Sequence, residues 1–239
     1  MPGDLAAAIG WWRDAGVDLH FTDEPRDWLE RPDAAAKSGP APVAAPPPPP
    51  EPEPERIGGD PAELPATLPE FTTWWLTEPS LDHGMTERRV PPRGPAKAPL
   101  MVLVEQPDSN DEAELLSGPQ GQVLNAILGA LGMDPAQVYV AACLPRHTPL
   151  PDWPALAAAG LGQVLAHHIA LAAPQRLLLL GSNISSLLGH DPAKSADPLT
   201  HFNHGGAIWS ALTAPGLDIL GARPRGKARL WQALLDWTG

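Results

Sequence analysis

The sequence predicts an α/β fold, a three-layer αβα sandwich around a four-stranded, mainly parallel sheet. Leu100–Val104 is an unbroken apolar run, and a strand that is apolar on both faces is typical of a buried parallel sheet. Similar runs alternate with amphipathic stretches through the C-terminal part of the chain, the pattern of repeated β–α units. Glu105, Gln106, Pro107 and Asp108 end the first run, where open α/β sheets bind ligands.

The remaining elements follow from the same patterns. In Gly118–Leu131 the apolar residues fall on one helical face, and Gly132 suits the C-terminal cap. Val- and Ala-rich or Leu-rich segments predict further strands, and Ala- and Leu-rich segments predict helices. In order, we expect a strand at Gln137–Leu144, a helix at Trp153–Ala173, a strand at Arg176–Leu180, a short helix from Ser182 to Gly189, a strand at Leu217–Leu220 and a helix at Lys227–Trp237.

Three segments are expected along the chain. Residues 1–31 form a short amphipathic helical segment, and residues 32–69 form a Pro/Ala/Glu-rich linker with too little apolar surface to fold. Residues 70–239 hold the α/β domain. Trp11, Trp12 and Trp28 give the first segment an apolar anchor, which either docks on its own domain or binds a partner protein.

The net charge, the single cysteine and the N-terminal sequence exclude several classes of function. The net charge is −12, so we expect any DNA binding to be weak. The single cysteine, Cys143, excludes an iron–sulfur cluster held by one chain, and we expect no cofactor and no metal. The N-terminus lacks the pattern of a secretory signal, and no long apolar span follows. We therefore expect a cytoplasmic protein with no membrane segment, most simply a monomer.

Two clusters of aromatic and histidine residues have a structural and a functional interpretation. Phe71–Leu76, with its paired tryptophans, is either a lid on the core or a platform for stacking bases, and the lid is favoured. His190, His201 and His204 could in spacing hold a metal, but they lack supporting carboxylates or cysteines, so solvated loop histidines are favoured.

Residues 100–239 resemble the uracil-DNA glycosylase superfamily, in particular its iron–sulfur branch. Val104–Asp108 stands where the family has Gly-Glu-Ala-Pro-Gly, and Gly118–Leu124 resembles its Gly-x-x-Gly-x-Leu-Leu helix start. Val138–Leu144 is similar to the next strand of the family. Pro174–Gly181 is similar to its Pro-x-x-Ile-x-x-Leu-Gly segment, and Ala222–Trp231 to its His-Pro loop and basic helix.

The resemblance also implies where a site would be and what it has lost. Such a glycosylase stacks a flipped base on an aromatic ring, reads it with an amide and stabilises the leaving anion with a histidine. Those positions are held here by Leu116, Ala142 and Arg223. If the chain were active, Glu105 and Arg223 would be its catalytic residues. The implied pocket residues are Gln106, Pro107, Asp108, Leu116, Ala142, Gly181 and Pro224, and the implied DNA-facing residues are Arg225, Lys227 and Arg229.

Two functions remain as hypotheses. The first is a degenerate glycosylase fold that serves DNA repair or replication as a non-catalytic scaffold, with a partner bound through the N-terminal segment. Its layout is similar to that of the psi-subunit family of the DNA polymerase III clamp loader. The second is an active but atypical glycosylase that excises uracil or another deaminated base. Glu105 itself either retains a ligand contact, caps a neighbouring helix or pairs with Arg223.

Overall fold

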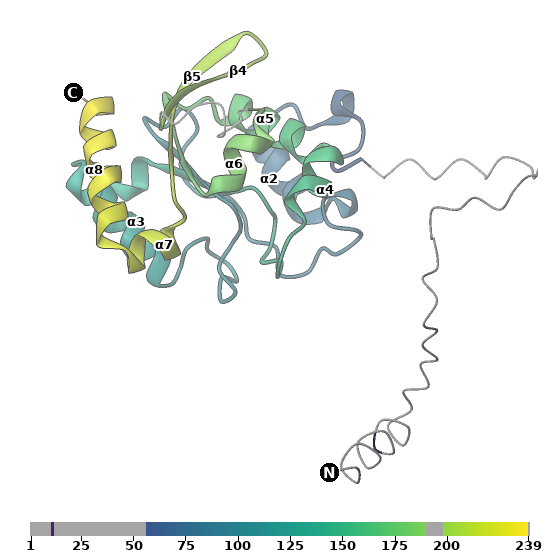
Figure 1. Ribbon diagram of the computed structural model, residues 1–239. Coiled ribbons are helices and arrows are strands. Elements are labelled where there is room, and N and C mark those ends of the chain that lie inside the picture. Colours follow the sequence, from purple (N-terminus) through teal and green to yellow (C-terminus); the bar gives the residue numbers. More distant parts are fainter. Residues whose placement is uncertain (1–10, 12–55, 190–197, 239) are drawn as a thin grey trace, which may run out of the picture. The chain divides into compact units, whose positions relative to one another are not determined.

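The computed structural model describes Trp11 and residues 56–189 and 198–238 (Figure 1). The chain divides into two units, residues 1–51 and 52–239. Trp11, the described residue of the first unit, lies in a helix with its side chain 63% exposed. Trp12, Trp28 and the proline-rich residues 32–55 lie outside the described residues, so the expectations for them stay predictions. None of the helices described is long and apolar enough to cross a membrane.

A five-stranded sheet forms the centre of the second unit. Its strands are β1 (Met101–Val104), β2 (Tyr139–Ala142), β3 (Arg176–Leu180), β4 (Leu199–His204) and β5 (Ala207–Ala214). The spatial order is β2-β1-β3-β5-β4. The first four strands in that order run parallel, and β4 pairs antiparallel with β5 at the edge. The predicted α/β class is confirmed, and so is a mainly parallel sheet, but the predicted strand count of four is wrong.

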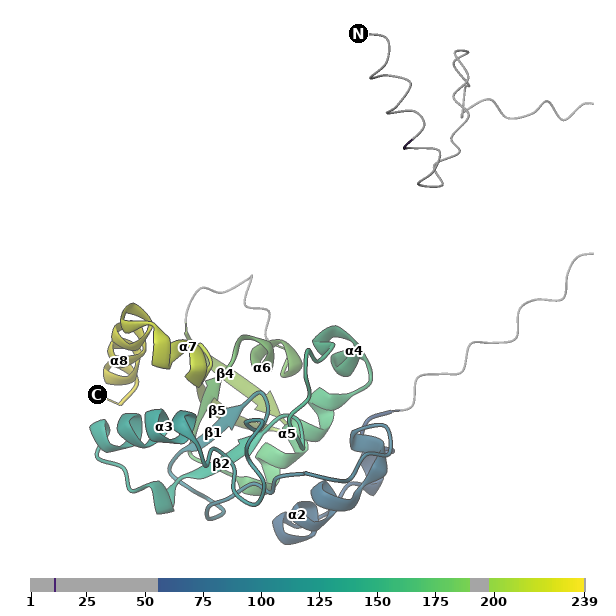
Figure 2. The same ribbon diagram turned by 90° about the horizontal axis from the view of Figure 1, so that it is seen from below.

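Helices cover both faces of this sheet, which makes three layers (Figures 1 and 2). Met101 and Leu103 of β1 point to one face and Val102 and Val104 to the other, as alternation along a strand requires. The Met101 face packs against α2 (Leu68–Thr77), α4 (Trp153–Ala158), α5 (Leu161–Ala172) and α6 (Ser182–Leu187). The Val102 face packs against α3 (Pro119–Ala130), α7 (Leu217–Ala222) and α8 (Pro224–Thr238).

The fourth parallel strand is not where the sequence placed it. Leu217–Leu220, the predicted strand, lies in helix α7, where Leu217 and Leu220 are buried with the helical spacing of three. The strand is β5, which forms a hairpin with β4 through Gly205 and Gly206, both at positive φ. A Gly-Gly pair between alternating residues is a hairpin signal that the sequence analysis did not use.

Two other boundaries also differ from the prediction. The single helix expected at Trp153–Ala173 is divided into α4 and α5 by Gly160, whose φ of 99° is outside the helical range. The linker expected to reach residue 69 instead joins the domain at Arg56. Ile57 is buried and its N–H donates to the carbonyl of Ala159 at 2.9 Å. Pro65 accepts a hydrogen bond from the ring of His167, which fixes residues 56–69 on α5.

Helix α2 lies on the core, as the lid interpretation of its aromatic residues predicts. Thr67 and Glu70 form a capping box at its start. Phe71 and Trp75 are buried, and the Trp75 ring N–H donates to the carbonyl of Val90 at 3.3 Å. The Phe71 ring stacks on that of His168 with centroids 4.3 Å apart.

His168 is a fully buried histidine on α5. Its Nε2 lies 2.8 Å from the hydroxyl of Tyr139, and its Nδ1 has no hydrogen-bond partner among the described residues. Burial disfavours the charged imidazolium and lowers the pKa of His168 to about 3, with a smaller contribution from His167. The histidine is therefore neutral in the folded protein at ordinary pH.

Candidate functional site

The carboxyl ends of the four parallel strands meet at one edge of the sheet, and this is the candidate site. Glu105–Asp108 follow β1 there, Cys143–Thr148 follow β2, Gly181 follows β3 and Ala214 ends β5. The β1 strand ends where the apolar run gives way to polar residues and Pro107, which has no backbone N–H to donate. The sequence thus predicted the place of Glu105, Gln106, Pro107, Asp108, Ala142 and Gly181.

Glu105 caps helix α6, one of the three roles considered for it. Its Oε1 accepts hydrogen bonds from both the backbone N–H and the side-chain amide of Asn183, each at 2.9 Å. Asn183 is in the first turn of α6, so the carboxylate also lies at the positive end of that helix. Gly181, at φ 148°, allows the Glu105 side chain to reach α6, because a Cβ at position 181 would lie 2.3 Å from the Glu105 Cγ.

The other side chains of this loop are also bound within the protein. Gln106 Oε1 accepts from the backbone N–H of Thr148 at 2.8 Å, which links the loops after β1 and β2. His147 Nδ1 lies 3.2 Å from the Pro107 carbonyl. Asp108 Oδ1 accepts from the Gln120 side-chain amide at 2.8 Å. Burial raises the pKa of Asp108, nearby Asp111 raises it further, and the Gln120 hydrogen bond opposes both.

Asp111, which the sequence analysis did not single out, organises the loop between β1 and α3. It is only 3% exposed, and it accepts hydrogen bonds from the N–H groups of Asp108, Leu116 and Ser117 and from the Ser117 hydroxyl. Burial alone would raise the pKa of Asp111, but these four donors together hold it below its usual value. They also hold Leu116 at a φ of 59° with its side chain in the core, so Leu116 does not line an open pocket.

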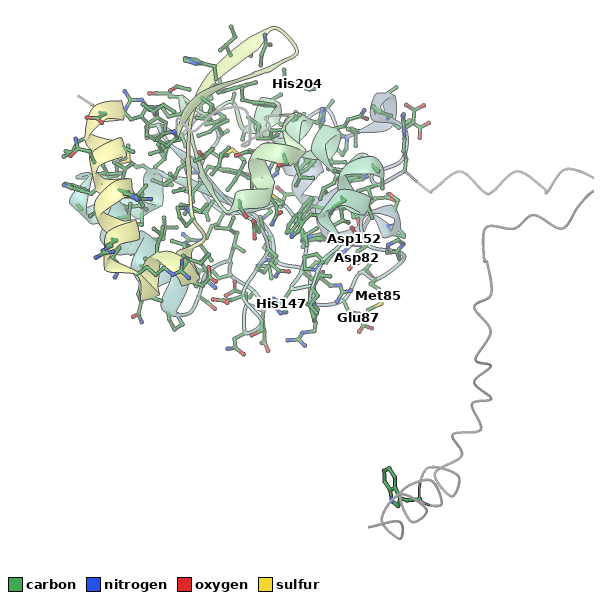
Figure 3. The ribbon with its side chains drawn as sticks, in the orientation of Figure 1. Asp82, Met85, Glu87, His147, Asp152 and His204 are labelled. Carbon is green, nitrogen blue, oxygen red and sulfur yellow. The ribbon has the colours of Figure 1, made fainter. Side chains whose placement is uncertain are left out.

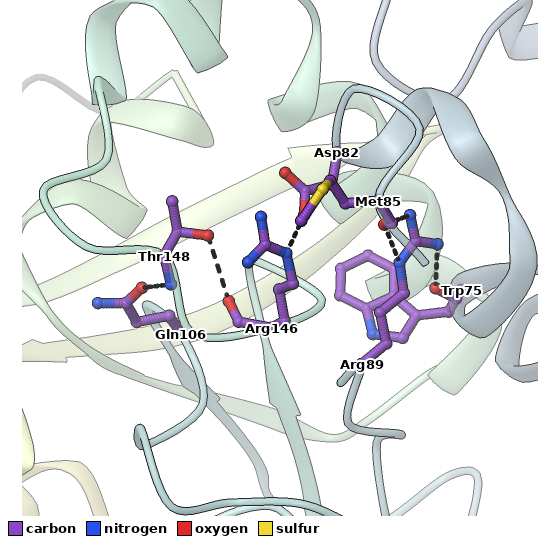
Figure 4. A network of polar contacts seen from close by, with 7 residues as sticks. All are labelled: Trp75, Asp82, Met85, Arg89, Gln106, Arg146 and Thr148. Atoms are coloured by element: carbon purple, nitrogen blue, oxygen red, sulfur yellow. Dashed lines mark hydrogen bonds and ion pairs between the residues drawn. The ribbon is translucent and has the colours of Figure 1, made fainter. Parts of the chain in front are cut away.

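Three arginines join the segment before β1 to the loops at this edge, and a fourth joins that segment to α2; no local pattern predicts any of the four. Arg88 donates to the carbonyl of Ser109, Arg93 donates to that of Leu115, and Arg146 forms an ion pair with Asp82. Arg89 is 6% exposed and donates to the carbonyls of Met85 and Trp75 (Figure 4). Burial lowers the pKa of Arg89, while the carboxylates of Asp82 and Glu78 oppose this. We call Arg88, Arg89, Arg93 and Arg146 the arginine brace.

The basic residues predicted for catalysis and DNA contact lie on other elements. Arg223 is exposed in the turn between α7 and α8, and Pro224 begins α8. The residues that follow the fourth parallel strand are Pro215 and Gly216.

Two hollows among the described residues lie on the β4 side of the protein. One has a volume of about 210 Å³ between β4 and α6, and includes Thr200, His201 and Ser185. The other, of about 380 Å³, lies between α4, α5 and β4 and includes Arg56, Gln163 and His204. Neither is lined by Glu105, Gln106, Leu116 or Arg223. Figure 3 shows Asp82, Met85 and His147 on one side of the molecule and His204 at the other end.

The histidines and the cysteine show no metal or redox site in the part of the chain that is described. His201 and His204 lie on β4, where an odd and an even position point to opposite faces, and His190 lies outside the described residues. Within residues 56–189 and 198–238, no three His, Cys, Asp or Glu side chains are placed to hold a metal ion. Cys143 is buried, and burial raises the pKa of its thiol, with Glu105 adding to the effect.

Comparisons with known proteins give no family. No family model matches the chain, and no curated protein matches it significantly. At the carboxyl edge, side chains form hydrogen bonds with one another and with neighbouring backbone groups.

The capping role of Glu105 can be tested through stability. We expect Glu105→Ala to lower the free energy of unfolding by about 1–2 kcal/mol, because it removes the acceptor for two donors of Asn183. Glu105→Gln keeps a carbonyl oxygen and should cost about half as much. Urea unfolding of the two variants measures this, and equal effects of Ala and Gln would contradict the capping role.

Proposed function

We propose that this protein is a non-catalytic binding protein built on a degenerate uracil-DNA glycosylase-like fold, and that it serves DNA repair or replication. One observation carries the non-catalytic part of the proposal. At the edge where a substrate would bind, polar groups are engaged by the chain itself: Glu105 with Asn183, Gln106 with Thr148, and His147 with Pro107. A substrate that used these groups would have to displace these contacts.

The residues that would do the chemistry support the same conclusion. Leu116 is buried in the core in place of a stacking ring, Ala142 offers no amide, and Arg223, which holds the histidine position, is exposed between α7 and α8. Loss of one preorganised electrostatic group typically costs about 10²–10³ in rate, and loss of base stacking about 1–3 kcal/mol in binding. With all of these absent, the carboxyl edge retains Glu105, which is engaged as a helix cap. The setting in DNA repair or replication comes from the resemblance of residues 100–239 to the glycosylase motifs.

A base-excision assay tests the proposal directly. Purified full-length protein, in large excess over the substrate, is incubated with single- and double-stranded oligonucleotides that carry one uracil, hypoxanthine or xanthine, and abasic sites are then cleaved with alkali. An active uracil-DNA glycosylase serves as the positive control. We expect no cleavage above background on any substrate. Cleavage that disappears in Glu105→Gln or Arg223→Ala would overturn the proposal and make the protein an atypical glycosylase.

The proposed binding function is tested by cross-linking the protein to its partner. Cross-linking of the tagged full-length chain in its own cells should recover a protein of DNA repair or replication. We propose the N-terminal segment, residues 1–31, with Trp11, Trp12 and Trp28, as the anchor, so deletion of that segment should remove the cross-link. A cross-link retained by the deletion variant would refute the anchor role of residues 1–31.

A further inference from the structure

The hollow between α4, α5 and β4 differs from the carboxyl edge in the state of its polar side chains. Its volume of about 380 Å³ is within the usual range of small-molecule sites, about 300–1,000 Å³. Arg56, Gln163 and His204 line it, and none of their side chains has a hydrogen bond or ion pair with another described residue. The polar side chains of the carboxyl edge, in contrast, bind one another and the backbone.

Helix α5 directs one of its faces into this hollow. Gly162, Gln163 and Ala166 all line it, and their spacing of three and four residues makes them neighbours on the helix surface. Gly162 also lies against the end of α6, because a Cβ at position 162 would lie 2.1 Å from the Leu187 carbonyl oxygen. The amide of Gln163 is therefore next to a wall formed by two helices in close contact.

Arg56 is held at the rim of the hollow by contacts at the start of α5. The N–H of the next residue, Ile57, donates to the carbonyl of Ala159 at 2.9 Å. The Arg56 Cγ lies 4.0 Å from the position that a Cβ would take at Gly160. The aliphatic part of this side chain is thus placed against α5, and its guanidinium group belongs to an exposed residue that a ligand can reach.

Strand β4 forms the opposite wall. Phe202 and His204 are two residues apart, so both point to the face that α5 covers, and their rings stack with centroids 6.3 Å apart. The N–H of Thr213 donates to the carbonyl of Pro198, which places the even-numbered residues of β4 in the hydrogen-bonded pairs with β5. The backbone N–H of Asn203 therefore points to the open edge of the sheet, where Asn203 lines the hollow.

These groups form a set of hydrogen-bond donors without a carboxylate. Arg56 offers a guanidinium fork, Gln163 an amide NH₂ group and His204 at least one ring N–H. The described residues that line the hollow include no Asp or Glu, although the chain has 28 acidic and 16 basic residues. A guanidinium fork matches two oxygens of a phosphate or carboxylate group. The donor set therefore favours an anionic group.

The rest of the lining is apolar and suits the carbon part of a ligand. Leu187, Leu188 and Phe202 contribute large apolar side chains, and Ala157 and Ala158 of α4 leave space beside them. In Figure 3, His204 lies at the end of the molecule away from His147, so this hollow is separate from the carboxyl edge. Its volume suits a small molecule with one anionic end.

We propose that this hollow binds a small organic anion, either a phosphate monoester or a carboxylic acid. The anionic oxygens bind Arg56, and the carbon part lies against Leu187, Leu188 and Phe202. The net charge of −12 opposes the approach of any anion, but about 0.15 M salt screens charges beyond about 8 Å, whereas the donors of the hollow contact the ligand directly. The inference goes beyond the proposed function and does not depend on whether the protein excises bases.

The test is an NMR titration of isotope-labelled full-length protein. The probes are monobutyl phosphate and pentanoate, with butanol as the uncharged control. We expect saturable shifts of the Gln163 side-chain amide and the Asn203 backbone N–H with an anion and none with butanol. The anion that binds more tightly identifies the ligand as a phosphate ester or a carboxylic acid. Loss of the carbon part, as in inorganic phosphate or formate, should weaken binding at least about 4-fold, the effect of about one buried CH₂.

Substitutions of two exposed arginines separate the hollow from the general charge of the protein. Arg56→Ala should weaken binding of the preferred anion by about 10-fold or more, because it removes a charge-assisted contact. Arg56→Lys keeps the charge without the fork and should recover part of that loss. Arg229→Ala is the matched control. It removes the same side chain from α8, which packs on the other face of the sheet, so affinity should hold within about 2-fold.

Four outcomes would overturn the inference. These are no saturable shift with either anion at millimolar concentration, equal shifts with butanol, saturable shifts only at residues away from the hollow, and equal loss of affinity in Arg56→Ala and Arg229→Ala. Circular dichroism of each variant verifies that the fold is retained. Because anion binding and base excision are separate readouts, failure here would leave the proposed non-catalytic function standing.

Discussion

Asp82→Ala is expected to destabilise the protein by about 3 kcal/mol, one of the two largest effects we predict. Asp82 forms the ion pair with Arg146, and the two side chains are only 15% and 22% exposed. Its carboxylate also stabilises the charge of Arg89, which is nearly buried. Removing one partner of a buried pair leaves the other charge without compensation, which typically costs about 3–5 kcal/mol. Chemical unfolding of wild type and variant measures the difference.

The exposed ion pair between Arg93 and Glu114 provides the matched control. The Glu114 side chain is 65% exposed, so Glu114→Ala should cost less than about 1 kcal/mol. The double variant Asp82→Leu with Arg146→Met should recover part of the loss, because it leaves no unpaired charge at that site. If Asp82→Ala costs no more than Glu114→Ala, the arginine brace does not hold the segment before β1 in the way the contacts indicate.

The second large effect is a loss of stability in mild acid that depends on His168. The unfolded chain binds a proton at this histidine below about pH 6.5, whereas the folded chain does so only near pH 3. Stability falls wherever the unfolded state binds more protons as pH is lowered, so His168 destabilises the fold progressively between those two values. At about pH 5 this amounts to about 2 kcal/mol relative to neutral pH.

Comparison of two neighbouring histidines isolates this effect. His168→Gln has no charge to bury and keeps an acceptor for the Tyr139 hydroxyl, so about 2 kcal/mol of the acid sensitivity should disappear. His167→Gln alters a half-buried ring that bonds to the carbonyl of Pro65 and should leave that sensitivity in place. Urea unfolding at about pH 7.5 and about pH 5 provides the comparison. An unchanged pH dependence in His168→Gln would show that the fold does not depend on a neutral His168.

The elements that local pattern could predict are those with strong apolar periodicity. β1, β2, β3, α3 and α8 lie where the alternation of buried runs and amphipathic stretches indicated. Between β4 and α8 the prediction is wrong: the apolar residues of Leu217–Leu220 indicate a strand, and the structure has helix α7 there. The hairpin of β4 and β5 depends on two glycines and on pairing with β3, and the pairing is a tertiary contact.

For the candidate site, the sequence predicted the position of the loop after β1 but not the hydrogen-bond partners of its side chains. That Glu105–Asp108 lie at the carboxyl edge follows from the strand that precedes them. The contacts of these side chains depend on partners far along the chain: Asn183 for Glu105, Thr148 for Gln106 and Ser109 for Arg88. No local pattern encodes such pairs, since their members are separated by 78, 42 and 21 residues.

The sequence by itself determined the α/β class, the buried strands and the acidic balance of this protein, because these depend on composition and on short-range periodicity. The tertiary structure alone decided the contacts at the carboxyl edge, where Asn183 binds Glu105 and Thr148 binds Gln106. These contacts come from side-chain directions set by packing, and a linear pattern of residue types does not specify those directions.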